Sequence, residues 1–124
     1  MPGASAGIVA GVVAGLLVVL TDPPTVAAHS LLLEARPAAG SAVPAPTRVM
    51  LRFNNRIEKR LSSATLVDPE QTRLRLVVVT TEGAADTLAL LAPPLAPGTY
   101  HLEWQVLSAD GHVVSGRYPF RVVP

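Results

Sequence analysis

The 124-residue chain contains no cysteine. A disulfide framework, a thiolate zinc site and a thiol nucleophile are therefore all excluded. Charge is also scarce: charged residues make up 15% of the sequence, and ten Lys and Arg nearly balance nine Asp and Glu. The arginines are scattered, and the few aromatic residues do not alternate with a basic stripe, which argues against a nucleic-acid partner. The length suffices for one small domain.

Residues 1–28 differ in composition from the rest of the chain. The uncharged apolar run at residues 8–20, IVAGVVAGLLVVL, is shorter than the roughly 20 residues of a membrane-spanning helix. Helix-breaking TDPP follows, and then TVAA, whose small residues suit signal peptidase. The pattern predicts a signal peptide over residues 1–28, with cleavage that makes His29 the new N-terminus. Because MPGASAG has no Lys or Arg, an uncleaved anchor or a wrongly assigned start is the alternative.

From residue 29 onward, apolar residues recur at every second position, the pattern of strands that bury one face. The pattern is clearest in TRVMLRFN (47–54), in TYHLEWQV (99–106) and from residue 118 onward. The residues predicted to face inward are Val49, Leu51, Phe53, Tyr100, Leu102, Trp104, Val106, Tyr118, Phe120 and Val122. SATLVD, TRLRLVVV and DTLALL predict three more strands, and NNRIEKRL has room for one helical turn.

Six or seven short strands separated by Pro- and Gly-rich turns predict an all-β sandwich or barrel. We expect the aromatic side chains of Tyr100, Trp104 and Phe120 to fill its core. A fold of this class does not by itself define a function.

The sequence has three histidines. His101 alternates outward on its strand and is predicted to face solvent. His112 follows Asp110 by two residues across Gly111, and residues i and i+2 of an extended or turn segment point to the same side. The carboxylate and the imidazole can therefore converge on one metal ion. Asp-Gly is also a common turn pair, so this corner alone is a weak signal, and an ordinary turn is the favoured interpretation.

His29 changes the interpretation of that corner. An N-terminal histidine offers its α-amine and its ring Nδ1, both of which a divalent metal can bind at neutral pH. With Asp110 and His112 the set comprises three nitrogens and one oxygen, which suits Cu(II); zinc would accept the same donors in a tetrahedral arrangement. This set of four donors requires cleavage directly before His29, since one extra residue would convert the α-amine of His29 to an amide. Otherwise His29 is a chance residue in a processing region.

Three segments resemble the CopC family of periplasmic copper-resistance proteins: AHSLLLEARPAAGSAV (28–43), VMLRFN (49–54) and GTYHLEWQVLSADGHVVSGRYPFRV (98–122). In that family the mature chain begins with His, an apolar strand leads to a Pro-Ala/Gly-Ser turn, and the last third carries a Ser-x-Asp-Gly-His corner. A Gly precedes the aromatic final strand. All these elements occur here in order, over residues 29–124.

The resemblance implies an immunoglobulin-like Greek-key β-sandwich or barrel of about seven strands. It implies a monomeric, non-enzymatic, extracytoplasmic protein that binds one Cu(II) through His29, Asp110 and His112 and serves copper homeostasis or resistance. It also implies exchange of copper with an inner-membrane protein of the CopD type. A site rigid at the Asp110–His112 turn and flexible at the His29 terminus would suit a carrier.

The chain departs from the family pattern at two places. Some members have a Met-rich segment that binds Cu(I) through thioethers, whereas residues 29–124 contain a single methionine, Met50. We therefore expect a Cu(II) protein without a Cu(I) thioether site and interpret Met50 as an ordinary strand residue. Many members also have an acidic residue near the copper soon after the LRF strand. Here Asn54 and Asn55 stand at those positions, and Glu58 follows three residues after Asn55. The side-chain amides of the two asparagines could hydrogen-bond to a copper ligand or to water.

Two other functions compete with this interpretation. An oxidative copper enzyme such as a lytic polysaccharide monooxygenase also chelates copper with an N-terminal His, but Asp110 would occupy a position that an oxygen-activating site keeps open. A non-catalytic immunoglobulin-like adhesion or accessory module would carry the Asp110–His112 corner as a plain turn. A hydrolytic relay is disfavoured, because Ser108, Asp110 and His112 are too close on one segment for the usual geometry.

Overall fold

The computed structural model describes residues 31–124, together with Gly3, Gly11, Ala14 and Gly15. The predicted signal segment, apart from those four positions, and His29 lie outside the described residues. Within the described part of the chain, no helix has the length and apolar character needed to cross a membrane.

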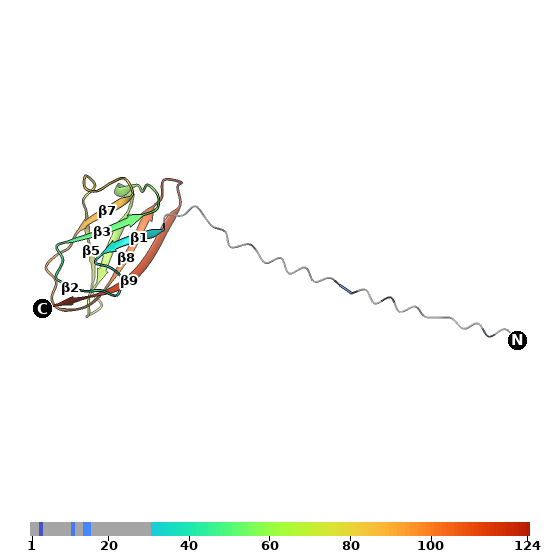
Figure 1. Cartoon of the computed structure of the whole chain (residues 1–124), viewed down its shortest axis with the longest axis horizontal. Helices are drawn as coiled ribbons and strands as arrows, with labels where there is room; N and C mark the ends of the chain where they lie inside the picture. Colours follow the sequence, from blue (N-terminus) through green and yellow to red (C-terminus); the bar gives the residue numbers. More distant parts are fainter. Residues whose placement is uncertain (1–2, 4–10, 12–13, 16–30) are drawn as a thin grey trace.

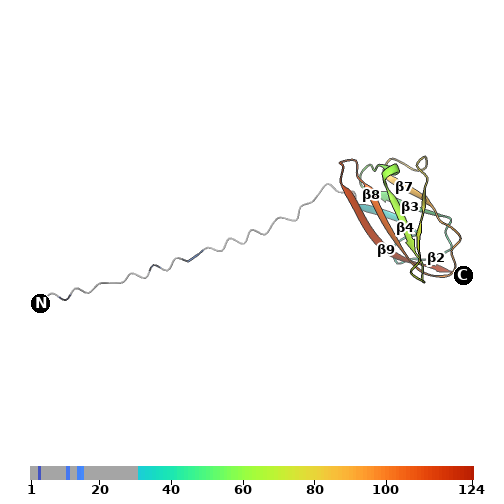
Figure 2. The ribbon, with the colours of Figure 1, turned by 180° about the vertical axis from the view of Figure 1, so that it is seen from behind.

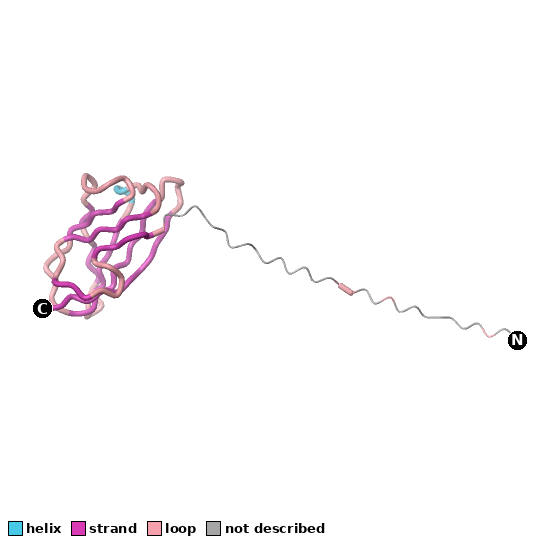
Figure 3. The backbone as a smooth tube through the Cα atoms, in the orientation of Figure 1, coloured by secondary structure: helices cyan, strands magenta, loops and turns pink. Residues whose placement is uncertain are grey.

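Two β-sheets pack face to face (Figures 1 and 3). The four-stranded sheet has the order β1-β3-β7-β6, formed by β1 (Leu32–Arg36), β3 (Arg48–Phe53), β7 (Thr87–Leu91) and β6 (Val77–Val78). The five-stranded sheet has the order β2-β9-β8-β4-β5, formed by β2 (Ala42–Pro44), β9 (Val113–Val123), β8 (Gly98–Leu107), β4 (Ser63–Val67) and β5 (Arg73–Arg75). β2 runs parallel to β9, and the other pairs are antiparallel. The predicted all-β, immunoglobulin-like Greek-key sandwich is confirmed.

The sandwich has nine described strands where the hydrophobic pattern alone suggested six or seven. TRLRLVVV, predicted as one strand, divides into β5 and β6, and each half joins a different sheet. Leu76 lies between the halves with 4% of its surface exposed, so the chain changes sheets while this side chain stays in the core. The predicted helical turn within NNRIEKRL is present as the 3-10 helix η1 (Lys59–Leu61).

The core lies between the sheets and contains all the residues that the period-two pattern predicted to face inward. The ring of Phe53 meets that of Trp104 edge to face, with centroids 5.1 Å apart, and Tyr100 stacks on Phe120 at 5.8 Å. Across the β8–β9 ladder, Trp104 pairs with Gly116. A Cβ atom at Gly116 would lie 2.3 Å from Trp104 Cζ2, so the indole occupies the space that any larger residue would need.

Antiparallel pairing brings several connections to one end of the sandwich. β1 begins opposite the last residue of β3, since Leu32 pairs with Phe53. The β8–β9 turn lies at this same end, as both ribbon views show (Figures 1 and 2). η1, which contacts β8, is also there. This end therefore holds the corner that the sequence singled out as a metal-binding candidate.

Candidate metal centre

The Asp110–His112 corner is the turn of the long β8–β9 hairpin. The two strands pair without interruption from Gly98↔Val122 to Leu107↔Val113. Beyond the last pair, the N–H of Gly111 donates to the carbonyl of Ser108 at 2.9 Å, and the N–H of Ser108 donates to the carbonyl of His112 at 2.8 Å. Gly111 has a φ of 88°, a left-handed conformation that favours glycine. The Asp-Gly pair thus closes a tight turn at the end of a rigid ladder.

The turn brings the Asp110 carboxylate and the His112 imidazole side by side. Asp110 Oδ2 lies 3.2 Å from His112 Nδ1, and Asp110 Oδ1 accepts the backbone N–H of His112 at 3.0 Å. That backbone hydrogen bond is the main reason why the pKa of Asp110 is lowered, with further contributions from the His112 side chain and the Ser108 hydroxyl. Asp110 is therefore ionised at neutral pH, the form in which a carboxylate binds a metal.

Both side chains remain accessible to solvent. The exposed fraction is 28% for the Asp110 side chain and 65% for the His112 side chain. Ser108, at the base of the turn, is 1% exposed. The turn is thus fixed at its base and open at its tip, which leaves an incoming ion a path to both donors.

Residues 54–58, which we name the bridging segment, hold the turn from the side. The carbonyl of Arg56 accepts the N–H of Ala109 at 2.9 Å, and the N–H of Glu58 donates to the carbonyl of Leu107 at 2.9 Å. Ile57 and Ser108 form an isolated β-bridge. The sequence did not reveal this support, because the two segments are about fifty residues apart and neither carries a periodic signal for the other.

The same segment also contacts the first residue of the continuous described chain. The N–H of Leu31 donates to Asn54 Oδ1 at 2.7 Å, and the N–H of Asn54 donates to the carbonyl of Leu31 at 3.0 Å. The sequence suggested that this amide could serve a ligand or water; in the structure, its partner is the backbone of Leu31. His29 lies outside the described residues, two positions before Leu31, a separation that spans at most about 7 Å between Cα atoms.

His101 is on β8, half-buried on the outer face of the five-stranded sheet, with Val67 and Pro119 as its cross-strand neighbours. The predicted outward orientation is correct, and the histidine is not brought to the β8–β9 turn. Among the described residues, no group of three or more His, Asp or Glu side chains is arranged to hold a metal ion. The described part of the candidate site consists of Asp110 and His112.

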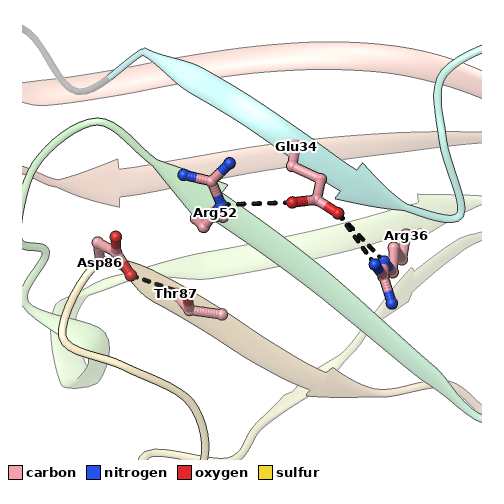
Figure 4. Close-up of polar contacts among 5 residues, drawn as sticks. All are labelled: Glu34, Arg36, Arg52, Asp86 and Thr87. Atoms are coloured by element: carbon pink, nitrogen blue, oxygen red, sulfur yellow. Dashed lines mark hydrogen bonds and ion pairs between the residues drawn. The ribbon is translucent and has the colours of Figure 1, made fainter.

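Met50 lies on the outer face of the four-stranded sheet. It lines a recess of about 190 Å³ with Glu34, Arg36, Arg52 and Thr87. Figure 4 shows Glu34 between the two arginines, accepting from Arg36 Nε at 3.2 Å and from Arg52 Nε at 3.3 Å. The thioether of Met50 therefore has guanidinium and carboxylate groups as its neighbours on this face.

Comparison with known proteins identifies relatives over most of the domain. The family model described as the CopC domain matches residues 32–123. Protein YobA of Escherichia coli K12 is 33% identical, over 80% of this chain and 82% of YobA. The copper transport protein CutJ of Bacillus subtilis is 29% identical over 86% of this chain, which corresponds to 20% of CutJ.

Two solved structures share the fold. CopC from Methylosinus trichosporium OB3b has a TM-score of 0.70 at 38% identity, covering 77% of this chain and 95% of that one. PcoC from Escherichia coli, described as a methionine-rich copper resistance protein, has a TM-score of 0.66 at 30% identity, covering 77% of this chain and all of that one.

Proposed function

The chain belongs to the CopC family, and we propose that it is a copper carrier that binds one Cu(II) ion through His29, Asp110 and His112. Membership of this family assigns the chain a copper-related function, in keeping with the copper-resistance and copper-transport names of its relatives. In the proposal, residues 1–28 are a signal peptide and residues 29–124 form the copper-binding domain, which acts outside the cytoplasm and is not an enzyme.

The observation that carries the proposal is the separation of the two described donors. Two atoms each about 2.0 Å from one ion lie about 2.8 Å apart at a right angle and about 3.3 Å apart at the tetrahedral angle. The 3.2 Å between Asp110 Oδ2 and His112 Nδ1 fits a shared ion with little adjustment. Since this distance suits copper or zinc, the choice of copper rests on the family and on the nitrogen-rich donor set.

His29 completes the set with its α-amine and its ring. An N-terminal imidazole and amine, a second imidazole and a carboxylate make a tetragonal N/O site of the kind that Cu(II) prefers. We expect no thioether site for Cu(I), because Met50 is the single methionine of residues 29–124 and has no methionine partner in this part of the sequence.

Release would involve a short arm. Leu31 is held by Asn54, and β1 begins at Leu32. In the proposal, the arm consists of His29 and Ser30, the two residues between the predicted cleavage site and Leu31. Detachment of these two residues would remove the amine and one imidazole together and leave the ion on Asp110 and His112, open to a receiving protein.

The receiving protein in this proposal is an inner-membrane copper transport protein of the CopD type. The match to CutJ supports it: a segment similar to this chain makes up 20% of a longer protein named for copper transport. Joining a copper carrier and a membrane transporter in one polypeptide would keep the carrier near its acceptor. The effective concentration of the carrier at the transporter would then be higher than for two separate proteins.

A competition titration with Cu(II) tests the proposal. Two proteins are compared: the chain that begins at His29, and the same chain with one alanine placed before it. We expect one equivalent of copper to bind the first form at least tenfold more tightly, because the added residue turns the amine ligand into an amide. Equal and weak binding by both forms would refute the proposal and favour the accessory-module interpretation of the turn.

A further inference from the structure

The bridging segment contacts both halves of the proposed site. At its start, Asn54 and Leu31 exchange two hydrogen bonds, of 2.7 Å to the side-chain oxygen and 3.0 Å between backbone groups. Two residues later, the carbonyl of Arg56 accepts the N–H of Ala109, the neighbour of Asp110, at 2.9 Å. One short stretch of chain thus links the N-terminal strand to the metal-binding turn.

The bridging segment is anchored in the body of the domain. Ile57 is 7% exposed and belongs to the hydrophobic core, and its N–H donates to the carbonyl of Ala85 at 3.0 Å. The N–H of Arg56 is satisfied by the side-chain oxygen of Asn55 at 2.9 Å. A segment with satisfied backbone groups and a buried apolar anchor opens less readily than an exposed loop, so it can serve as a fixed support.

Asn54 connects this fixed segment to the start of the N-terminal strand through its hydrogen bonds to Leu31. β1 is an edge strand of its sheet, and its first ladder pair is Leu32↔Phe53. Leu31 lies beyond that pair, with 60% of its surface exposed. The hydrogen bond to the Asn54 side chain adds to the backbone bond between the N–H of Asn54 and the carbonyl of Leu31, and together they hold the exposed end of an edge strand, where fraying is expected.

We propose that Asn54 is a positioning residue for the copper site, an inference that rests on the proposed function. By holding Leu31 against the segment that also supports the turn, Asn54 confines His29 to a small volume, since two residues span at most about 7 Å. Less chain entropy is then lost when the amine and imidazole reach the ion. Groups that hydrogen-bond directly to a metal ligand contribute roughly 10- to 100-fold in affinity; Asn54 acts two residues away, through Leu31, so we expect an effect at the lower end of that range.

The test uses the full chain, exported and purified after processing, with its N-terminus determined by mass spectrometry. We expect Asn54→Ala to weaken Cu(II) binding about tenfold in a competition titration. At neutral pH the nitrogen hyperfine couplings in the Cu(II) EPR spectrum should be fewer than in the wild type, with those of His112 retained. In the metal-free variant, the amide of Leu31 should exchange with solvent faster than in the wild type. Asn54→Asp keeps the acceptor oxygen and should restore the affinity and the EPR spectrum.

Two further variants separate positioning from general stability. Leu31→Ala keeps the donor N–H and removes only an exposed side chain, so it should leave copper affinity near the wild-type value. Leu31→Pro removes the donor N–H while keeping Asn54 and should reproduce the loss seen with Asn54→Ala. If Asn54→Ala binds copper as the wild type does, or if Leu31→Ala is as impaired as Leu31→Pro, the positioning role is refuted. Weak copper binding by the processed wild type would instead refute the proposed function.

Discussion

At the scale of single residues, the two buried tyrosines of the core differ in the state of their hydroxyl groups. Tyr100 is 4% exposed and donates to the carbonyl of Ala96 at 2.7 Å. Tyr118 is 6% exposed, and its hydroxyl has no hydrogen-bond partner in the described part of the chain. Burial raises the pKa of Tyr118, so the hydroxyl stays protonated. A buried polar group without a partner lowers the stability of the folded state.

We therefore predict opposite effects for the two Tyr→Phe substitutions. Tyr118→Phe removes the unpartnered hydroxyl and should leave the free energy of unfolding unchanged or raise it by about 1 kcal/mol. Tyr100→Phe removes a hydrogen bond and should lower the free energy of unfolding by about 1 kcal/mol. Denaturant unfolding of both variants measures the difference, and an equal loss of stability in both would mean that the Tyr118 hydroxyl has a partner in solution.

At the scale of elements, the β8–β9 hairpin links the core to the proposed metal-binding turn. The same ladder that presents Asp110 and His112 at its tip places Trp104 and Gly116 opposite each other in its middle. Gly116 belongs to the motif on which the family resemblance rests. The structure gives it a steric reason: the Trp104 indole lies under the glycine and packs on Phe53.

Gly116→Ala is expected to destabilise the hairpin. The new Cβ would lie 2.3 Å from Trp104 Cζ2 and 2.6 Å from Cε2, so the indole or the strand has to move. Overpacking of this kind lowers stability by about 1–3 kcal/mol. Thermal unfolding and the near-ultraviolet circular dichroism of the single tryptophan should both change. Ser115→Ala, on the outer face next to it, is the matched control and should be nearly neutral; a neutral Gly116→Ala would show that the ring has room to shift.

At the scale of the whole molecule, the proposed ligands come from opposite ends of the chain. His29 precedes β1, whereas Asp110 and His112 follow β8, some eighty residues later. They can meet because β1 begins at the end of the sandwich where the β8–β9 hairpin turns (Figure 1). An unfolded chain holds these donors far apart, so an ion that needs all of them binds the folded state in preference.

Copper should accordingly raise the unfolding temperature of the processed protein. Binding confined to the folded state adds about 2.7 kcal/mol when free copper is 100 times the dissociation constant. Differential scanning calorimetry with buffered Cu(II) measures the shift. His112→Ala should lose most of it, while His101→Ala, which alters a histidine on the outer face of the sheet, should keep it. A shift unaffected by His112→Ala would place the copper elsewhere.

The sequence by itself determined the features that depend on neighbouring residues. Alternation along a strand is local, because successive side chains point to opposite faces, so the inward residues of β3, β8 and β9 could be identified without the fold. The Asp110–Gly111–His112 corner is equally local, since its geometry is set within one turn.

The tertiary structure alone decided that residues 72–79 divide between two sheets and that Gly116 must lie over Trp104. It alone showed that Asn54 holds Leu31 beside the segment supporting the turn. These features are contacts between residues far apart in the chain, and such contacts leave no periodic pattern in a single sequence.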